Sequence, residues 1–356
     1  MARRYVALAP GAFASRSGKT AHGVIAYASD PTVAVVDPDH AGRRVRDVVP
    51  YLASDAPIVA DVADALRYAP TALLVGVAPT GGALPPDWRR SILAALDAGL
   101  EVVSGLHDEL ARDPEFAAAA ERSGTTIRDV RVPPPVPLFS GRAYDVAARV
   151  VLTVGSDCAV GKMTASLELT RAAREAGVRA RFVATGQTGI LIAGGGIAID
   201  RVVADFAPGA AEELVVDASR DSDLLFVEGQ GGINHPAYAP VSLALLYGAA
   251  PDALVLVHCA GRTVIEDFAT PILPYRMLIR TYEALCAGVK PARVVGIALN
   301  TVDLDEADAH KAIDEARAET GLPADDVVRF GPRALYDAIA PQLAHKTRPL
   351  RAEEGA

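Results

Sequence analysis

Residues 150–164 restrict the possible folds of this chain more than any other stretch. The run at 150–154 is aliphatic and β-branched, which predicts a short buried strand. Gly155 and Gly161 bound the loop that follows, and Lys162 begins a segment with helical spacing of apolar residues. A strand, a glycine-bounded loop and a helix N-terminus direct backbone N–H groups and the positive end of a helix dipole at one point. The stretch therefore predicts a phosphate-binding loop.

The predicted loop departs from the usual pattern at two positions. Ser156 stands where the first glycine is usual, and Gly155 comes one residue early. Met163 occupies the position of the hydroxyl that normally binds Mg²⁺, and Thr164 follows one residue late. The alternative is an ordinary strand–turn–helix corner, but a Gly-Lys pair between a strand and a helix favours the phosphate loop. The residues predicted to bind the cofactor here are Gly155, Ser156, Asp157, Cys158, Ala159, Val160, Gly161, Lys162, Met163 and Thr164.

Composition limits the class of protein. Of the 356 residues, 51% are hydrophobic and 5% aromatic, which suits Val-rich parallel strands packed against Ala-rich helices. The net charge of −9 argues against a nucleic-acid partner, and we expect small-molecule ligands instead. Cys158, Cys259 and Cys286 make no disulfide framework, and no apolar run is long enough to span a membrane. We therefore expect a cytoplasmic homo-oligomer with no membrane partner.

Strand-like and helix-like segments alternate through the first part of the chain, which predicts an α/β fold. A small Rossmann-like doubly wound sheet is expected at 1–132. The prolines that follow cannot enter a helix or a central strand, so 133–138 is a stiff linker. Residues 139–356 form the phosphate-loop domain, a parallel sheet with helices on both faces. Its predicted strands are 150–154, 181–184, 223–227, 253–258, 293–299 and 327–330.

Several polar residues follow predicted strands, where ligands of parallel sheets bind. Gly18-Lys19-Thr20 is a second Gly-Lys-Thr, but Phe13 stands at its first glycine position, which favours a strand–helix corner over a second nucleotide site. His107 follows the strand at 101–104 and is a candidate for substrate binding; a helix-capping or surface histidine is the alternative. Glu228 directly follows the strand at 223–227. This is the usual place of an acid that holds Mg²⁺ or a polarised water.

The phosphate-loop half resembles the dethiobiotin synthetase group of enzymes. The loop of that group runs Gly-Thr-Asp-Thr-x-Val-Gly-Lys-Thr, with the glycine spacing of Gly155 and Gly161, so the early glycine is normal there. The Glu-Gly-x-Gly-Gly of the group is similar to residues 228–232. By this resemblance Asn300, at the end of a strand, lies near the adenine of the cofactor. Met163 departs from the pattern.

A narrower resemblance covers nearly the whole chain. Five separated motifs are similar to those of the DUF1611 family, which has a Rossmann-like N-terminal domain and a phosphate-loop C-terminal domain. The family includes D-glutamate N-acetyltransferases, which use acetyl-CoA in amino-acid catabolism. The resemblance implies the same fold and an acyl transfer. The motifs are 19–23, 104–107, 155–164, 185–189, and 228–231 with 235–238.

The first functional hypothesis is transfer of an acetyl group from acetyl-CoA to the amine of an acidic amino acid, with D-glutamate as the first acceptor to test. Glu228 and His235 are the candidate catalytic bases, and the N–H groups at 229–232 can stabilise the thioester oxyanion. Arg142 and Arg262 can each hold a substrate carboxylate in a bidentate fork, unless they form ordinary surface ion pairs. The remaining substrate-binding candidates are His107, Gln187 and Gln230.

Two other hypotheses stay open. One is an ATP-dependent ligase or kinase of the dethiobiotin synthetase type acting on a small carboxylate or amine; Lys162, Thr164 and Glu228 then serve ATP, and the last two bind Mg²⁺. The other is a nucleotide-sensing or scaffold protein without enzymatic activity. Cys158 adds a possible nucleophile, because a helix N-terminus and a nearby lysine lower a thiol pKa, although a bound phosphate opposes this.

Overall fold

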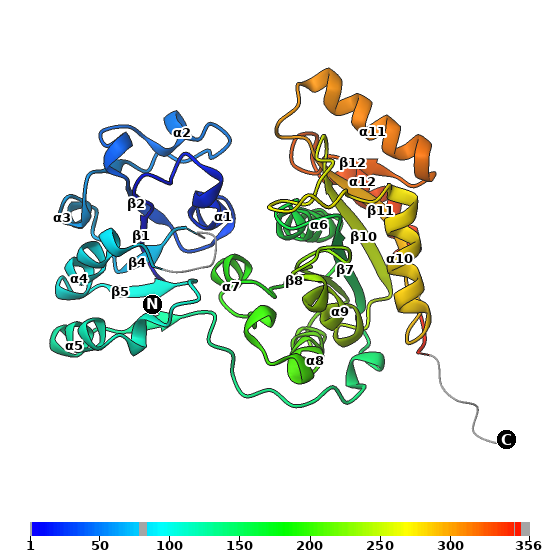
Figure 1. Cartoon of the computed structure of the whole chain (residues 1–356), viewed down its shortest axis with the longest axis horizontal. Coiled ribbons are helices and arrows are strands. Elements are labelled where there is room, and N and C mark those ends of the chain that lie inside the picture. The colour runs from blue at the N-terminus through cyan, green and yellow to red at the C-terminus, as the bar shows by residue number, and fades with distance from the viewer. Residues whose placement is uncertain (1, 78–83, 345, 350–356) are drawn as a thin grey trace. The chain divides into compact units, whose positions relative to one another are not determined.

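The computed structural model describes residues 2–77, 84–344 and 346–349. The chain divides into two compact units, which are described separately. The N-terminal unit contains residues 1–133 together with 187–198, and the C-terminal unit contains 134–186 and 199–356 (Figure 1). The segment 187–198 therefore belongs with the N-terminal unit, although it lies within the second half of the sequence. No helix in the described part of the chain is long and apolar enough to cross a membrane.

The N-terminal unit contains a six-stranded parallel sheet in the order β3-β2-β1-β4-β5-β6. The order reverses between β1 and β4, as in dinucleotide-binding folds, so the predicted Rossmann-like sheet is confirmed. Apolar residues such as Val6, Leu8 and Leu73 are fully buried in the strands, as sheets covered on both faces require. The strands are β1 (Tyr5–Leu8), β2 (Thr32–Val36), β3 (Ile58–Val59), β4 (Ala72–Val75), β5 (Glu101–Ser104) and β6 (Ile127–Asp129).

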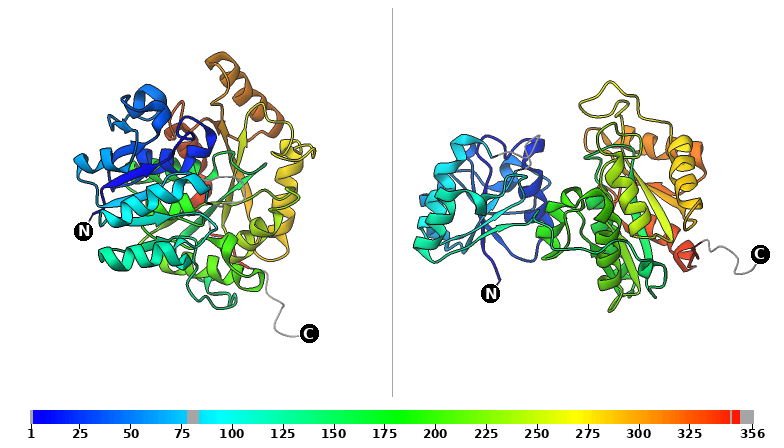
Figure 2. Two further views of the ribbon diagram at one scale, coloured as in Figure 1. Left: turned by 60° about the vertical axis from the view of Figure 1, so that its left-hand side comes forward. Right: turned by 60° about the horizontal axis from the view of Figure 1, so that its bottom comes forward.

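Helices cover both faces of this sheet. Helix α1 (Lys19–Tyr27) packs against α7 (Gln187–Ala193) on one face (Figure 2). On the other face α4 (Arg89–Asp97) packs between α3 (Val62–Ala65) and α5 (Pro114–Ser123). A further short helix, α2 (Val45–Val48), follows β2.

The C-terminal unit contains a second six-stranded parallel sheet, in the order β12-β11-β10-β7-β9-β8. The phosphate-loop strand β7 lies at its centre, between β10 and β9, so the loop opens at the middle of the carboxyl edge. This confirms the predicted parallel sheet. The strands are β7 (Arg149–Gly155), β8 (Ala180–Val183), β9 (Leu224–Val227), β10 (Ala253–Cys259), β11 (Arg293–Asn300) and β12 (Ala324–Asp325).

Helices also cover both faces of the second sheet. On one face α6 (Lys162–Glu175) packs against α12 (Arg333–Ile339). On the other face α9 (Ala239–Gly248) packs between α8 (Ala207–Ala218) and α10 (Tyr275–Ala287) (Figure 2). Helix α11 (Glu306–Thr320) contacts α10 and β12.

One predicted strand of this unit is wrong. Residues 327–330 form turns, and the edge strand β12 lies just before them. Asp326 explains the difference, because its carboxylate accepts the backbone N–H groups of Val328 and Arg329, both at 2.9 Å. An aspartate that binds the backbone two and three residues ahead forms a turn and ends a strand.

Candidate active site at the phosphate loop

The phosphate loop connects β7 to α6, and two of its residues have a left-handed backbone. Gly161, which precedes the helix, has φ +106°, and Ala159 has φ +51°. Gly155 allows a close approach, since a Cβ there would lie 2.7 Å from Lys162 Nζ and 2.9 Å from the carbonyl oxygen of Asp157. The loop thus lies close against the lysine side chain. Its left-handed residues are typical of loops that turn backbone N–H groups toward an anion.

Lys162 is buried at the first position of α6, with 6% of its surface exposed. Its ammonium donates a hydrogen bond to the carbonyl oxygen of Asp157 at 2.7 Å. Burial lowers the lysine pKa to about 8, against the opposing effects of Cys158, Asp157 and Glu228. A buried cation at a helix N-terminus favours an anion beside it, because a negative charge offsets the cost of its burial.

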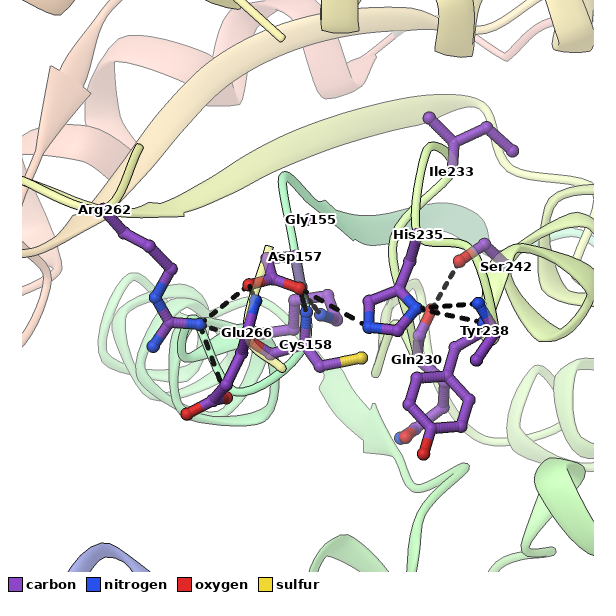
Figure 3. Close-up of polar contacts among 12 residues, drawn as sticks. Gly155, Asp157, Cys158, Gln230, Ile233, His235, Tyr238, Ser242, Arg262 and Glu266 are labelled. Carbon is purple, nitrogen blue, oxygen red and sulfur yellow. Dashed lines mark hydrogen bonds and ion pairs between the residues drawn. The ribbon is translucent and has the colours of Figure 1, made fainter. Parts of the chain in front are cut away.

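Arg262 forms hydrogen bonds to Asp157 and Cys158 of the loop (Figure 3). One carboxylate oxygen of Asp157 accepts a hydrogen bond from Arg262 Nη1 at 3.0 Å and another from the backbone N–H of Glu266 at 2.9 Å. The same Arg262 nitrogen donates to the carbonyl oxygen of Cys158 at 2.9 Å. This places Arg262 beside the loop, where its contacts hold the loop's conformation.

Glu228 lies just beyond the end of β9, almost completely buried. Its Oε2 accepts the backbone N–H groups of Thr185 at 3.0 Å and Gly186 at 3.1 Å. Burial nevertheless raises the pKa of this carboxyl to about 7, while the two N–H groups, Gln230 and Lys162 act in the opposite direction. A carboxyl that is part protonated at neutral pH suits the transfer of a proton.

The glycine-rich segment after Glu228 packs directly on β7. A Cβ at Gly229 would lie only 1.8 Å from the carbonyl oxygen of Thr153, so no side chain fits there. Gln230 donates from its side-chain amide to the Thr185 hydroxyl at 3.1 Å. Its backbone carbonyl oxygen accepts a hydrogen bond from the Ser242 hydroxyl at 2.7 Å. These contacts fix the backbone N–H groups of the segment close to the phosphate loop.

His235, at the end of this segment, has a defined orientation (Figure 3). Its Nδ1 accepts the backbone N–H groups of Ala237 at 3.1 Å and Tyr238 at 3.2 Å. The ring is buried between the rings of Tyr238 and Phe268, with centroid separations of 4.6 and 5.2 Å. Its Nε2 faces Asp157 Oδ1 at 3.8 Å. Burial lowers the pKa of the imidazole, so the ring is neutral near pH 7.

Two further residues of the site were not among the predicted ones. The Tyr282 hydroxyl donates to the carbonyl oxygen of Gly155 at 2.7 Å and accepts the N–H of Ile233 at 3.0 Å, which links the two loops. His258 Nδ1 lies 2.8 Å from the Ser156 hydroxyl, and burial lowers the imidazole pKa to about 4. His258 lies next to the last residue of β10 and shortly before Gly261-Arg262, and this position at a strand end was a signal in the sequence. Tyr282 lies within α10, and its position gave no such signal.

The other predicted residues are distributed as follows. Asn300 lies beside Gly161, since its Cβ and amide nitrogen would each be 3.8 Å from a Cβ there. Met163 and Thr164 are half-buried in the first turn of α6. Arg142 forms an ion pair with Glu213 of α8. Gln187 and His107 belong to the N-terminal unit, where the Gln187 amide donates to the Thr20 hydroxyl at 2.7 Å.

Comparison with known proteins places this geometry in a family. Residues 137–336 match the description "Domain of unknown function (DUF1611_C) P-loop domain", and residues 38–133 match "Domain of unknown function (DUF1611_N) Rossmann-like domain". The chain belongs to the DUF1611 family. A crystal structure of a DUF1611 family protein from Anabaena variabilis is similar, with a TM-score of 0.91 and 42% identity, and the match covers 95% of this chain and 99% of that one.

Two curated relatives of this DUF1611 protein carry the name D-glutamate N-acetyltransferase. The relative from Tritonibacter scottomollicae is 40% identical over 75% of this chain and 80% of its own length. The relative from Pseudoalteromonas sp. is 37% identical over 76% of this chain and 81% of its own length. The predicted membership of the DUF1611 family is therefore confirmed.

Proposed function

We propose that this DUF1611 protein is an N-acetyltransferase that moves the acetyl group of acetyl-CoA to the amine of D-glutamate. The similarity to two proteins of that name, over three quarters of the chain, supports the reaction. The observation in the site that carries it is Glu228, a buried carboxyl whose pKa of about 7 suits a general base. Amide formation requires such a base, because the attacking amine must lose a proton.

The phosphate loop supplies the binding of the donor. CoA carries a pyrophosphate and a 3′-phosphate, and either can bind the N–H groups of the loop and the Lys162 ammonium. The donor set fits Mg²⁺ poorly. Met163 offers a thioether where a hard cation requires oxygen, and Oε2 of Glu228 is already occupied by two backbone N–H groups. A phosphate loop of this composition favours binding of CoA without a metal.

The glycine-rich segment can serve the acyl group itself. Of the N–H groups at 229–232, that of Gly229 already donates to the Thr153 hydroxyl at 3.0 Å, which leaves those at 230–232 for the acyl group. These lie in a backbone fixed by Gln230, Ser242 and Tyr282. Preorganised N–H groups stabilise the negative charge that develops on a thioester oxygen during attack. As the C–N bond forms, Glu228 takes the proton of the amine and these donors hold the charge on the oxygen. The C–S bond then breaks, and CoA leaves as the thiol with a proton returned to its sulfur.

An ATP- and Mg²⁺-dependent ligase is the second candidate, because an acid after β9 and a lysine on the loop also suit ATP. A thermal-shift panel of acetyl-CoA, CoA, ADP and ATP with Mg²⁺ separates the two, since a ligand of the native state raises its apparent stability. We expect acetyl-CoA and CoA to raise the melting temperature without metal. A rise with ATP and Mg²⁺ alone would favour the ligase. Mass spectrometry of the product from D-glutamate and L-glutamate then identifies the acceptor.

A further inference from the structure

His235 is held in a single tautomer by the backbone. Nδ1 accepts two N–H groups, from Ala237 and Tyr238, and a backbone N–H can only donate. The neutral ring must therefore carry its proton on Nε2. A proton on Nδ1 would point at both N–H groups, so the charged ring is disfavoured by geometry as well as by burial.

The Nε2–H group points at the phosphate loop. Asp157 Oδ1 is 3.8 Å from Nε2, which is beyond the range of a hydrogen bond. The ligand atoms of Asp157, Cys158 and His235 all lie within 4.8 Å of one another, a grouping compact enough for a metal ion. Metal binding at Nε2 needs a lone pair there, however, and the bonds at Nδ1 place the proton on that nitrogen instead. The Nε2–H group is therefore suited to donate a hydrogen bond to an oxygen atom.

We propose that His235 is an Nε2–H donor to an oxygen of the ligand bound at the phosphate loop, and acts neither as a base nor as a metal ligand. The inference deepens the proposed function and rests on it for the identity of the ligand. Two oxygens of acetyl-CoA have the required chemistry: a phosphate oxygen in the bound state, or the thioester oxygen as it gains negative charge.

The titratable groups around the ring do not alter this role. Asp157 and Asp267 favour the charged imidazole, while burial and Lys162 oppose it, and the net effect is a lowered pKa. Cys158 lies on the Nε2 side with Asp157. The stacked Tyr238 and the edge of Phe268 hold the ring in place.

Two substitutions separate the functions of the two ring nitrogens. His235→Asn keeps an acceptor near the position of Nδ1, which preserves the bonds to Ala237 and Tyr238, but removes the donor at Nε2. His235→Gln carries an amide N–H to about the reach of Nε2 and cannot act as a base at neutral pH. Far-UV circular dichroism and melting temperature confirm that both variants fold.

The expected results distinguish the two oxygen sources. We expect His235→Gln to remain within about tenfold of the wild type and to keep its pH profile. For His235→Asn, loss of an oxyanion donor lowers kcat by about 10²–10³ with little change in the Kd for CoA. Loss of a phosphate contact instead weakens CoA binding by about 10- to 100-fold and leaves kcat at saturating CoA unchanged. Either loss, with activity retained by His235→Gln, supports the proposal.

Other outcomes overturn it. Wild-type kcat and CoA affinity in His235→Asn would show that the donor has no role. Equal loss in both variants, restored by added imidazole, would assign a base. Zinc retained by the wild type through gel filtration and lost from His235→Asn would assign a metal ligand. Because CoA affinity and the ¹⁵N shifts of His235 need no turnover, they test the donor even if D-glutamate is not the acceptor; a protonated Nδ1 in those spectra contradicts it.

Discussion

The Lys162 ammonium lies 2.7 Å from the carbonyl oxygen of Asp157, so the lysine donates to the phosphate loop of which it forms the end. A ligand phosphate can take over such a contact, because it offers a charged acceptor in place of a neutral one.

Lys162→Ala should therefore weaken binding of CoA by about 10- to 100-fold, the loss expected for hydrogen bonds to a charged group. The matched control is Lys19→Ala at the second Gly-Lys-Thr, where Lys19 is exposed and the Thr20 hydroxyl is bonded to Gln187. Isothermal titration calorimetry measures both affinities. Equal affinity in Lys162→Ala and the wild type would contradict the phosphate-loop assignment.

The pH profile of the reaction tests Glu228 as the base. A base must be deprotonated to accept a proton. The contribution of Glu228 to kcat/KM should therefore rise with pH and reach a plateau above the pKa of about 7. Glu228→Gln should lower kcat by about 10²–10⁴ and remove this inflection. Initial rates between pH 5.5 and 8.5 measure the effect. An unchanged inflection in the variant would assign it to another group, such as the acceptor amine.

The same substitution, Glu228→Gln, should lower activity but raise stability at high pH. The folded protein holds a proton on Glu228 between its ordinary pKa of 4.5 and about 7, so the ionised carboxyl destabilises the fold as pH rises through that range. Glu228→Gln removes this penalty, since an amide does not ionise. Relative to the wild type, the variant should gain about 1–3 kcal/mol in unfolding free energy from pH 5 to pH 8. Urea unfolding at both values checks this, and a difference independent of pH would refute the raised pKa.

Gly229 is predicted to be intolerant of any side chain. Its Cβ would lie 1.8 Å from the carbonyl oxygen of Thr153, so Gly229→Ala must displace the backbone of β7 or of the segment itself. We expect a loss of about 3 kcal/mol or more in unfolding free energy. Gly288→Ala in the same unit is the control, because it has no atom within 4 Å of its Cβ and φ is −78°. Equal stability of the two variants would contradict the close approach.

The sequence predicted the features that depend on local spacing. Gly155, Gly161 and Lys162 lie within one short stretch, so their pattern was sufficient to place the loop between β7 and α6. The burial of Lys162 could not be predicted from the sequence, because it depends on the packing of the surrounding segments around the lysine.

Contacts that join distant segments gave no signal in the sequence. Arg262, predicted to bind a substrate carboxylate, contacts the Asp157 carboxylate and the carbonyl oxygen of Cys158, more than a hundred residues earlier. No strand forms at 327–330, because the turn that Asp326 makes outweighs the β-propensity of the two valines there. Tyr282 bonds the loop through a hydroxyl to Gly155, a contact that no sequence spacing encodes.

The most direct test of the account is turnover with acetyl-CoA and D-glutamate in the presence of EDTA, followed by the free thiol that CoA releases. We expect thiol release that depends on both substrates and needs no added metal, because Met163 and the bonds already made by Glu228 leave a poor site for Mg²⁺. Turnover that requires ATP and Mg²⁺, with no thiol released from acetyl-CoA, would contradict it and assign the chain to the ligases.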